Sequence, residues 1–117
     1  MKRSGLPLAA VAALVPSLAF AGQYAPLQCA DANSAAEKTI CHSYALGQDE
    51  ARMATLYAIA TSLVAMGRRG DLQDQQRTWI KARENCGADA ACLAKSYAKR
   101  IDELNGVIAG IAARGPF

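Results

Sequence analysis

The sequence predicts an all-α protein, a small disulfide-stapled helical bundle or hairpin of three to four helices. Apolar residues recur at spacings of three and four over long stretches, which is the period of an amphipathic helix. No segment alternates apolar and polar residues with period two, so we expect no sheet. The chain has 117 residues, enough for one small domain, and its four cysteines are an even set that can cross-link it.

The N-terminal segment is predicted to be a secretory signal peptide over residues 1–21. Lys2 and Arg3 form a positively charged start, and residues 6–20 are apolar apart from one serine. The Ala-Phe-Ala sequence that ends at residue 21 has the small residues that signal peptidase requires. The apolar run is short and contains proline, so a retained transmembrane helix is disfavoured. We expect cleavage after residue 21 and one helical domain over 22–117, periplasmic or secreted, with no membrane span.

Charge and composition restrict the class of partner. Removal of Lys2 and Arg3 reduces thirteen basic residues to eleven, against ten acidic ones, so the mature chain is nearly neutral. No basic stripe interleaved with aromatic residues is present, which argues against nucleic acid. No cofactor is expected, and the oligomeric state is left open.

The cysteines are predicted to form disulfides, because an exported chain meets an oxidising compartment. Zinc knuckles of the Cys-x2-Cys type are missing, and the only histidine, His42, adjoins a cysteine rather than completing a metal cluster. Four cysteines allow three connectivities, among which sequence does not choose. We favour the two local pairs, Cys29 with Cys41 and Cys86 with Cys92. Each closed loop would contribute about 2 to 4 kcal/mol.

The first predicted helix begins near Ser34, which forms a capping box with Glu37. The chain before it contains proline and shows no period, so we expect an extended lead-in. The helix is expected to pause within residues 42–47, where serine and glycine weaken helix propensity, and to resume over 51–66. The apolar face of this second part consists of Leu46, Met53, Leu56, Tyr57, Ala60, Leu63 and Val64.

Two more helices follow. The segment Gly-Arg-Arg-Gly at residues 67–70 is predicted to be a short exposed loop, with Asp71 capping the next helix. One face of that helix carries Leu72, Gln76, Trp79, Ile80 and Arg83. Gly87 then ends it, and Asp89 caps a last helix that runs to about Ala113. The apolar stripe of the last helix consists of Leu93, Tyr97, Ile101, Leu104, Val107, Ile108 and Ile111.

Most residues with distinctive chemistry are predicted to be structural. Trp79 lies on an apolar stripe, so a core position is favoured over a role as a partner anchor. Arg83 is one turn further on, and its stem is expected to pack on an aromatic ring. The carboxylate expected to pair with Arg83 is Asp49, Asp102 or Glu103. The adjacent carboxylates at 49–50 and 102–103 are otherwise expected on a solvated face, without the fixed pair that glycoside hydrolysis requires.

Catalysis is disfavoured, because the chain lacks a nucleophile with a base, a metal cluster and a cofactor motif. Cys41 adjoins His42, but neighbours on a helix point about 100° apart, and an oxidised cysteine is not a nucleophile. Arg68 and Arg69 are the exception to the structural interpretation. A loop bounded by glycines has no core role for two long cations, so we predict a partner-binding surface there, with a merely solvated loop as the alternative.

A further pattern runs from Cys29 to about Leu104. Its most specific part is Gln-Arg-x-Trp-x-x-x-Arg-x-x-Cys, from Gln76 to Cys86, followed by a second cysteine and Tyr-x-x-Arg-Ile. The residues involved are Cys29, Glu37, Ile40, Cys41, Leu46, Asp49, Tyr57, Gln76, Arg77, Trp79, Ile80, Arg83, Cys86, Cys92, Tyr97, Arg100 and Ile101. This pattern resembles the LprI-type lysozyme inhibitor domain.

The resemblance implies a non-enzymatic protein that binds and blocks a lysozyme-like muramidase. The members of its motif that we expect to be structural are Gln76, Arg77, Trp79, Arg83, Tyr97 and Arg100. A structural or assembly protein of the envelope, which binds another envelope protein and has no effect on lysozyme, is the alternative.

Overall fold

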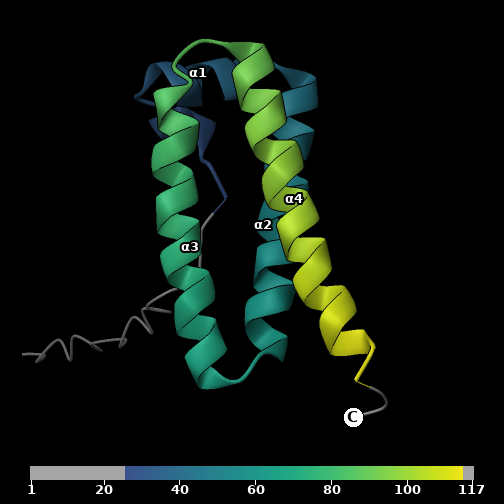
Figure 1. Cartoon of the computed structure of the whole chain (residues 1–117). Coiled ribbons are helices and arrows are strands. Elements are labelled where there is room, and N and C mark those ends of the chain that lie inside the picture. The colour runs from purple at the N-terminus through teal and green to yellow at the C-terminus, as the bar shows by residue number, and fades with distance from the viewer. Residues whose placement is uncertain (1–25, 115–117) are drawn as a thin grey trace, which may run out of the picture.

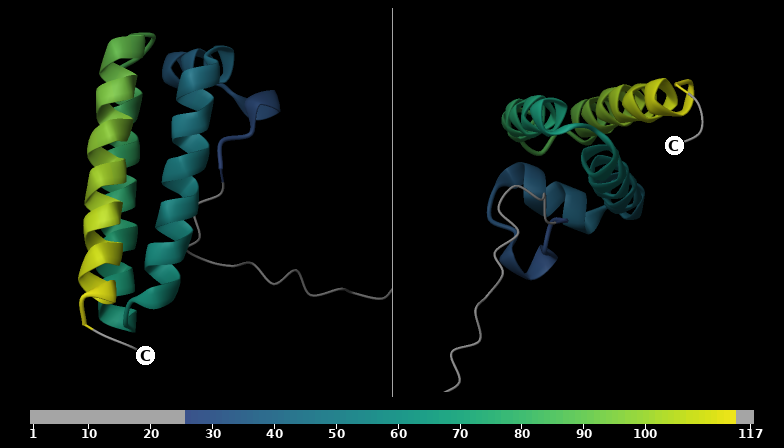
Figure 2. Two further views of the ribbon diagram at one scale, coloured as in Figure 1. Left: turned by 90° about the vertical axis from the view of Figure 1, so that its right-hand side faces the viewer. Right: turned by 90° about the horizontal axis from the view of Figure 1, so that it is seen from below.

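The computed structural model describes residues 26–114. This part of the chain consists of a short 3-10 turn, η1 (Cys29–Asp31), and four helices, α1 (Ala35–His42), α2 (Tyr44–Leu63), α3 (Met66–Asn85) and α4 (Ala90–Ala112). The three long helices run alongside one another, and α1 packs across the end at which α3 turns into α4 (Figures 1 and 2). No strand occurs between residues 26 and 114, so the predicted all-α class is confirmed. The predicted signal peptide lies outside the described residues.

Side-chain caps set the starts of α1 and α4. The Oγ of Ser34 accepts a hydrogen bond from the backbone N–H of Glu37 at 3.0 Å. The Oδ1 of Asp89 accepts one from the N–H of Cys92 at 3.0 Å. Each bond satisfies a donor that helix geometry leaves unpaired. Both caps were predicted from the sequence.

A single residue separates α1 from α2. Ser43 has an extended backbone, and its Oγ accepts a hydrogen bond from the N–H of Leu46 at 3.2 Å, which caps α2. The predicted pause is therefore present, but it is shorter than expected. Because Ser43 supplies a cap immediately, α2 begins at Tyr44 rather than near residue 51.

The predicted loop at residues 67–70 is wrong. α2 ends at Leu63, the connection passes through residues 64–65, and α3 starts at Met66, so both arginines lie inside α3. Asp71 is consequently a helix residue and not a cap. An interior glycine costs a helix only about 1 kcal/mol relative to alanine, which packing elsewhere can offset.

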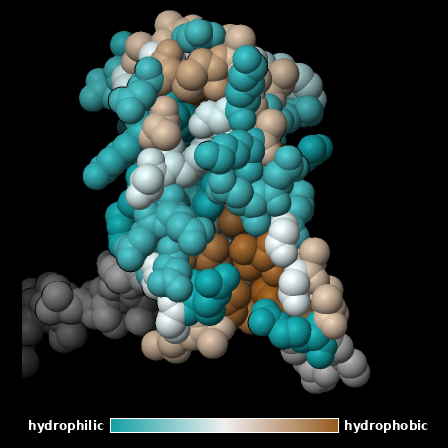
Figure 3. Space-filling model, viewed as in Figure 1, coloured by the Kyte–Doolittle hydropathy of each residue, from teal (hydrophilic) through white to brown (hydrophobic). Residues whose placement is uncertain are grey.

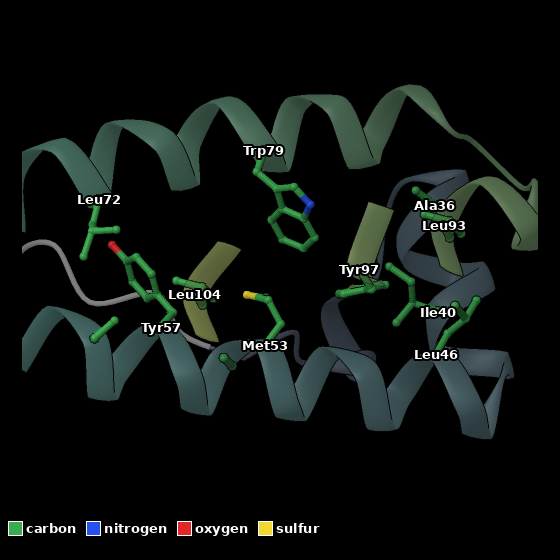
Figure 4. Packing of buried hydrophobic residues seen from close by; sticks show 12 residues of the cluster. Ala36, Ile40, Leu46, Met53, Tyr57, Leu72, Trp79, Leu93, Tyr97 and Leu104 are labelled. Carbon is green, nitrogen blue, oxygen red and sulfur yellow. The ribbon is translucent and has the colours of Figure 1, made fainter. Parts of the chain in front are cut away.

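The core runs along the space between the three long helices. Met53 and Tyr57 of α2 face Trp79 of α3 and Tyr97 and Leu104 of α4 (Figure 4). The rings of Trp79 and Tyr97 meet edge to face with centroids 5.2 Å apart. Full burial of a large apolar side chain contributes about 1.5 to 3 kcal/mol. The buried apolar residues are Ala36, Ile40, Leu46, Met53, Ala54, Tyr57, Ala60, Leu72, Trp79, Leu93, Tyr97, Leu104 and Ile111.

Two disulfides hold one end of the bundle. Cys29 is bonded to Cys41, which ties η1 to α1, and Cys86 is bonded to Cys92 across the α3–α4 turn. These are the two local pairs that we favoured, and the Cα atoms are 5.6 Å apart in each. Away from this end, α4 packs most extensively on α2 and diverges from α3 (Figure 1). The end with the α2–α3 turn has no cross-link in the described residues.

Gly87 in the α3–α4 turn has a φ of 56°, in the left-handed region that disfavours a side chain. We predict that Gly87→Ala lowers the free energy of unfolding by about 1 to 2 kcal/mol. Gly47 is the matched control, because it lies in α2 and a Cβ there meets nothing within 4 Å. Gly47→Ala should instead stabilise the protein by up to about 1 kcal/mol. Urea denaturation followed by circular dichroism measures both changes, and equal effects would contradict the assignment of strain to the turn.

Candidate functional site

A buried carboxylate joins the elements near the disulfide-bonded end. Glu50 of α2 is 5% exposed, and its Oε1 accepts a hydrogen bond from the backbone N–H of Leu27 at 3.1 Å. Its Oε2 accepts from the hydroxyl of Tyr97 at 2.5 Å and from Nη1 of Arg83 at 3.3 Å. One side chain therefore links the N-terminal segment to α2, α3 and α4.

The guanidinium of Arg83 completes this network. Its Nη2 donates to Oε1 of Glu84 at 2.8 Å, and its Cζ lies 5.5 Å from the centroid of the Trp79 ring. The ring thus contacts the arginine as predicted, and its Nε1 donates to the backbone carbonyl of Ser96 at 3.0 Å. The predicted partner carboxylates of Arg83 are wrong, since the partners are Glu50 and Glu84.

Glu50 was expected on a solvated face, and this expectation is wrong. Leu46, Glu50, Met53 and Tyr57 follow one another at steps of four, three and four, so they lie on one face of α2. All of them are buried. The spacing therefore indicated that Glu50 is buried. The adjacent Asp49 obscured this signal, because the two neighbouring acidic residues suggested a solvated face.

A second polar layer lies further along the bundle. The Oε1 of Gln76 accepts a hydrogen bond from Nε of Arg100 at 2.9 Å, and Nε2 of Gln76 donates to Sδ of Met53 at 3.2 Å. Arg100 is 1% exposed, and its Nη1 donates to Oε2 of Glu103 at 3.1 Å. The motif residues that the structure buries are Gln76, Trp79, Arg83, Tyr97 and Arg100. Arg77, the remaining one, is exposed and pairs with Asp74.

The environment shifts the pKa values of Tyr97 and Glu84 in opposite directions. Burial raises the pKa of Tyr97 well above its ordinary value, and the hydrogen bond to Glu50 raises it further, so the phenol remains a donor. Burial alone would raise the pKa of Glu84, but hydrogen bonds from Ser34 and Arg83 outweigh it and lower that pKa. Neither pKa is shifted toward neutral pH, where the pKa of an efficient general acid or base lies. The buried network therefore suits a structural role.

The exposed candidate lies at the opposite end, where the structure separates the two predicted arginines. Nε of Arg69 donates to the backbone carbonyl of Thr61 at 2.8 Å, so this side chain supplies a donor to the C-terminal end of α2. The side chain of Arg68 is 65% exposed, and its nearest carboxylate, Asp71, lies 3.9 Å away. Arg69 thus has a structural contact, and Arg68 remains the candidate for a partner.

Two apolar residues accompany Arg68 at this end of the bundle. Leu63, the last residue of α2, is 50% exposed, and Met66, the first residue of α3, is 81% exposed. We call Leu63, Met66 and Arg68 the tip, because the α2–α3 turn forms a convex end of the molecule (Figures 1 and 2). An exposed cation beside exposed apolar side chains suits contact with another protein.

The described residues contain neither a metal-binding cluster nor a membrane-spanning helix. Between residues 26 and 114, no group of three or more histidine, cysteine, aspartate or glutamate side chains is placed to hold a metal ion. In the same part of the chain, none of the helices has the length and apolar character needed to cross a membrane.

The comparison with protein families gives a match over residues 29–104 to the family described as lysozyme inhibitor LprI. The match covers more than half of the chain, which therefore belongs to the LprI lysozyme inhibitor family. This confirms the resemblance seen in the sequence. The matched region begins at the first cysteine and includes both disulfides, the buried polar network and the tip. No curated protein and no solved structure matches the chain.

The buried pair of Glu50 and Arg83 allows a direct test of the network. We predict that Glu50→Gln lowers the free energy of unfolding by about 3 to 5 kcal/mol, because it removes the buried charge opposite Arg83. The matched control is Asp49→Asn, the same change at the neighbouring half-buried carboxylate, which should stay within about 0.5 kcal/mol. Urea denaturation of both variants decides the matter. A loss of stability in Asp49→Asn as large as that in Glu50→Gln would refute the role given to Glu50.

Proposed function

We propose that the mature protein binds a lysozyme-like muramidase stoichiometrically and blocks it, with no catalytic activity of its own. Membership of the LprI lysozyme inhibitor family, over residues 29–104, is the observation that carries this proposal. The two disulfides support an extracytoplasmic location, because such bonds persist in oxidising compartments. Export through the signal peptide at residues 1–21, to the periplasm or the medium, is part of the proposal.

The tip is the surface that we assign to the muramidase. Blocking a cleft requires a convex element, and the tip is a convex end with an exposed guanidinium. The cleft of a muramidase carries a general acid and a second carboxylate. A guanidinium can donate two parallel hydrogen bonds to a carboxylate, which makes Arg68 the natural group to enter such a cleft.

The apolar neighbours of Arg68 support the same assignment. Taking two ions out of water costs free energy that their attraction offsets only with good geometry. Exposed Leu63 and Met66 would bury apolar surface around the ion pair, and this burial is favourable by about 25 cal/mol per Å². Since the mature chain is nearly neutral, long-range attraction adds little, and close fit at the tip must supply the affinity.

We predict that Arg68→Ala raises the inhibition constant at least tenfold, which corresponds to a loss of about 1.4 kcal/mol. A turbidity assay of muramidase action on cell walls, with purified mature protein added, gives the constant. The matched control is Arg77→Ala, because Arg77 is also 65% exposed and also pairs with an aspartate three residues away in sequence. Nine residues separate Arg77 from Arg68, which places it on the opposite side of α3.

Two outcomes of this assay would contradict part of the proposal. If the unmodified protein leaves several muramidases unaffected at about 50 μM, far above the Kd of a specific inhibitor, the inhibitor proposal fails. The envelope-assembly function then takes its place. If Arg68→Ala and Arg77→Ala inhibit as well as the unmodified protein, only the assignment of the tip is wrong. Arg69 is left intact in this design, because its hydrogen bond to Thr61 supports the fold.

A further inference from the structure

An apolar groove opens beside the tip, between the α2–α3 connection and the C-terminal half of α4. Its volume is about 680 Å³. In Figure 3, hydrophobic surface fills the hollow between α3 and the diverging end of α4. The residues that line the groove are Leu63, Val64, Ala65, Arg68, Glu103, Gly106, Val107, Gly110, Ile111 and Arg114.

Two of the α4 residues that line the groove have no side chain. Gly106 and Gly110 are one turn apart and therefore lie above one another on the same face. A Cβ built on either would meet nothing within 4 Å, so nothing in the described residues fills the space above them. Val107 and Ile111 border this strip and give the groove aliphatic walls.

The charge at the rim is positive. Arg68 and Arg114 line the groove, and both are exposed. The carboxylate that lines it, Glu103, already accepts a hydrogen bond from the buried Arg100 at 3.1 Å and lies 4.0 Å from Lys99. Arg68 is 3.9 Å from Asp71, and an exposed pair of this kind contributes little. A ligand that places carboxylates at the rim should therefore bind with the highest affinity.

We propose that this groove binds a protein segment that carries aliphatic side chains beside carboxylates, such as one face of an acidic amphipathic helix. Aliphatic anchors at helical spacing would enter the strip over Gly106 and Gly110, as in known helix-in-groove recognition. The carboxylates would pair with Arg68 and Arg114. A volume of about 680 Å³ lies within the range of binding pockets. A lipid bilayer is a less suitable partner, because a flat surface does not reach the floor of a concave groove.

The groove shares Leu63 and Arg68 with the tip, but its α4 wall lies outside the muramidase contact proposed above. Gly106, Gly110, Ile111 and Arg114 lie beyond the residues matched by the family, which end at 104. The groove is concave, whereas a cleft is blocked by a convex element. The peptide test that follows uses no muramidase, so its outcome can be told apart from the outcome of the inhibition assay.

A pair of synthetic peptides tests the proposal. Each has about 18 residues, long enough to form helix on binding, with leucine at helical spacing and either glutamate or lysine at the flanking positions. We expect the glutamate peptide to bind the ¹⁵N-labelled mature protein and to shift the amide signals of residues 106–111. The lysine peptide should bind at least tenfold more weakly. Absence of binding by the glutamate peptide up to about 1 mM, or equal binding of both peptides, would overturn the proposal.

Two substitutions test whether the glutamate peptide binds in the groove. Gly110→Leu fills the groove and suits an α-helix better than glycine, so the variant should fold and should bind the glutamate peptide at least tenfold more weakly. Gly47→Leu, the same change in α2 where a Cβ also meets nothing, should bind normally. Equal binding by these two variants would exclude the groove.

Charge reversal and lipid provide independent checks. Arg68→Glu should weaken binding of the glutamate peptide and strengthen binding of the lysine peptide, and an unchanged preference would contradict the role of the rim. Vesicles of anionic phosphatidylglycerol are the lipid probe. If the unmodified protein binds them and Gly110→Leu does not, the occupant is lipid, and the proposal of a protein segment is wrong.

Discussion

The hydrogen bonds to the buried carboxylate of Glu50 are the interaction on which the rest of the bundle depends. A buried charge is tolerated only when its hydrogen bonds are satisfied, and here the donors come from the N-terminal segment, α3 and α4. The requirement to satisfy one carboxylate therefore fixes the relative positions of segments that are far apart in the sequence. Hydrophobic burial brings these helices together, but it is not directional. The polar contacts select one arrangement among the ways in which apolar stripes could meet.

Strong constraints are concentrated at one end of the molecule. Both disulfides, the Glu50 network and the packing of α1 lie toward the α3–α4 turn. At the other end α4 packs on α2 and diverges from α3, and Gly106 and Gly110 line the groove that opens there. Leu63, Met66 and the arginines of the rim are exposed there. The bundle thus has one end held by disulfides and buried polar contacts, and one end that exposes apolar and cationic side chains.

Several errors of prediction share one cause: a local sequence pattern does not show which residues of other segments a side chain contacts in the folded protein. Glycines on either side of Arg68 and Arg69 suggested a loop, yet the segment is helical, and Arg69 donates to a carbonyl of α2. Glu50 looked solvated beside another acidic residue, although it occupies the buried face of α2. The spacing of the buried residues of α2 indicated the burial of Glu50, but it did not identify Arg83 and Tyr97 as its donors. The glycines likewise did not indicate the contact of Arg69 with α2.

The sequence by itself determined the all-α class, the order of the helices, the caps at Ser34 and Asp89 and the apolar faces, because these depend on periodicity and on neighbouring residues. It also contained the family pattern from Cys29 to Leu104, and it favoured the local disulfide pairs without excluding the others. Only the tertiary structure decided that Glu50 is the partner of Arg83, that Arg68 and not Arg69 is available at the tip, and that a groove opens over Gly106 and Gly110. These features arise where separate helices meet or diverge. They depend on the free energy of contacts between segments, which no single stretch of the sequence determines.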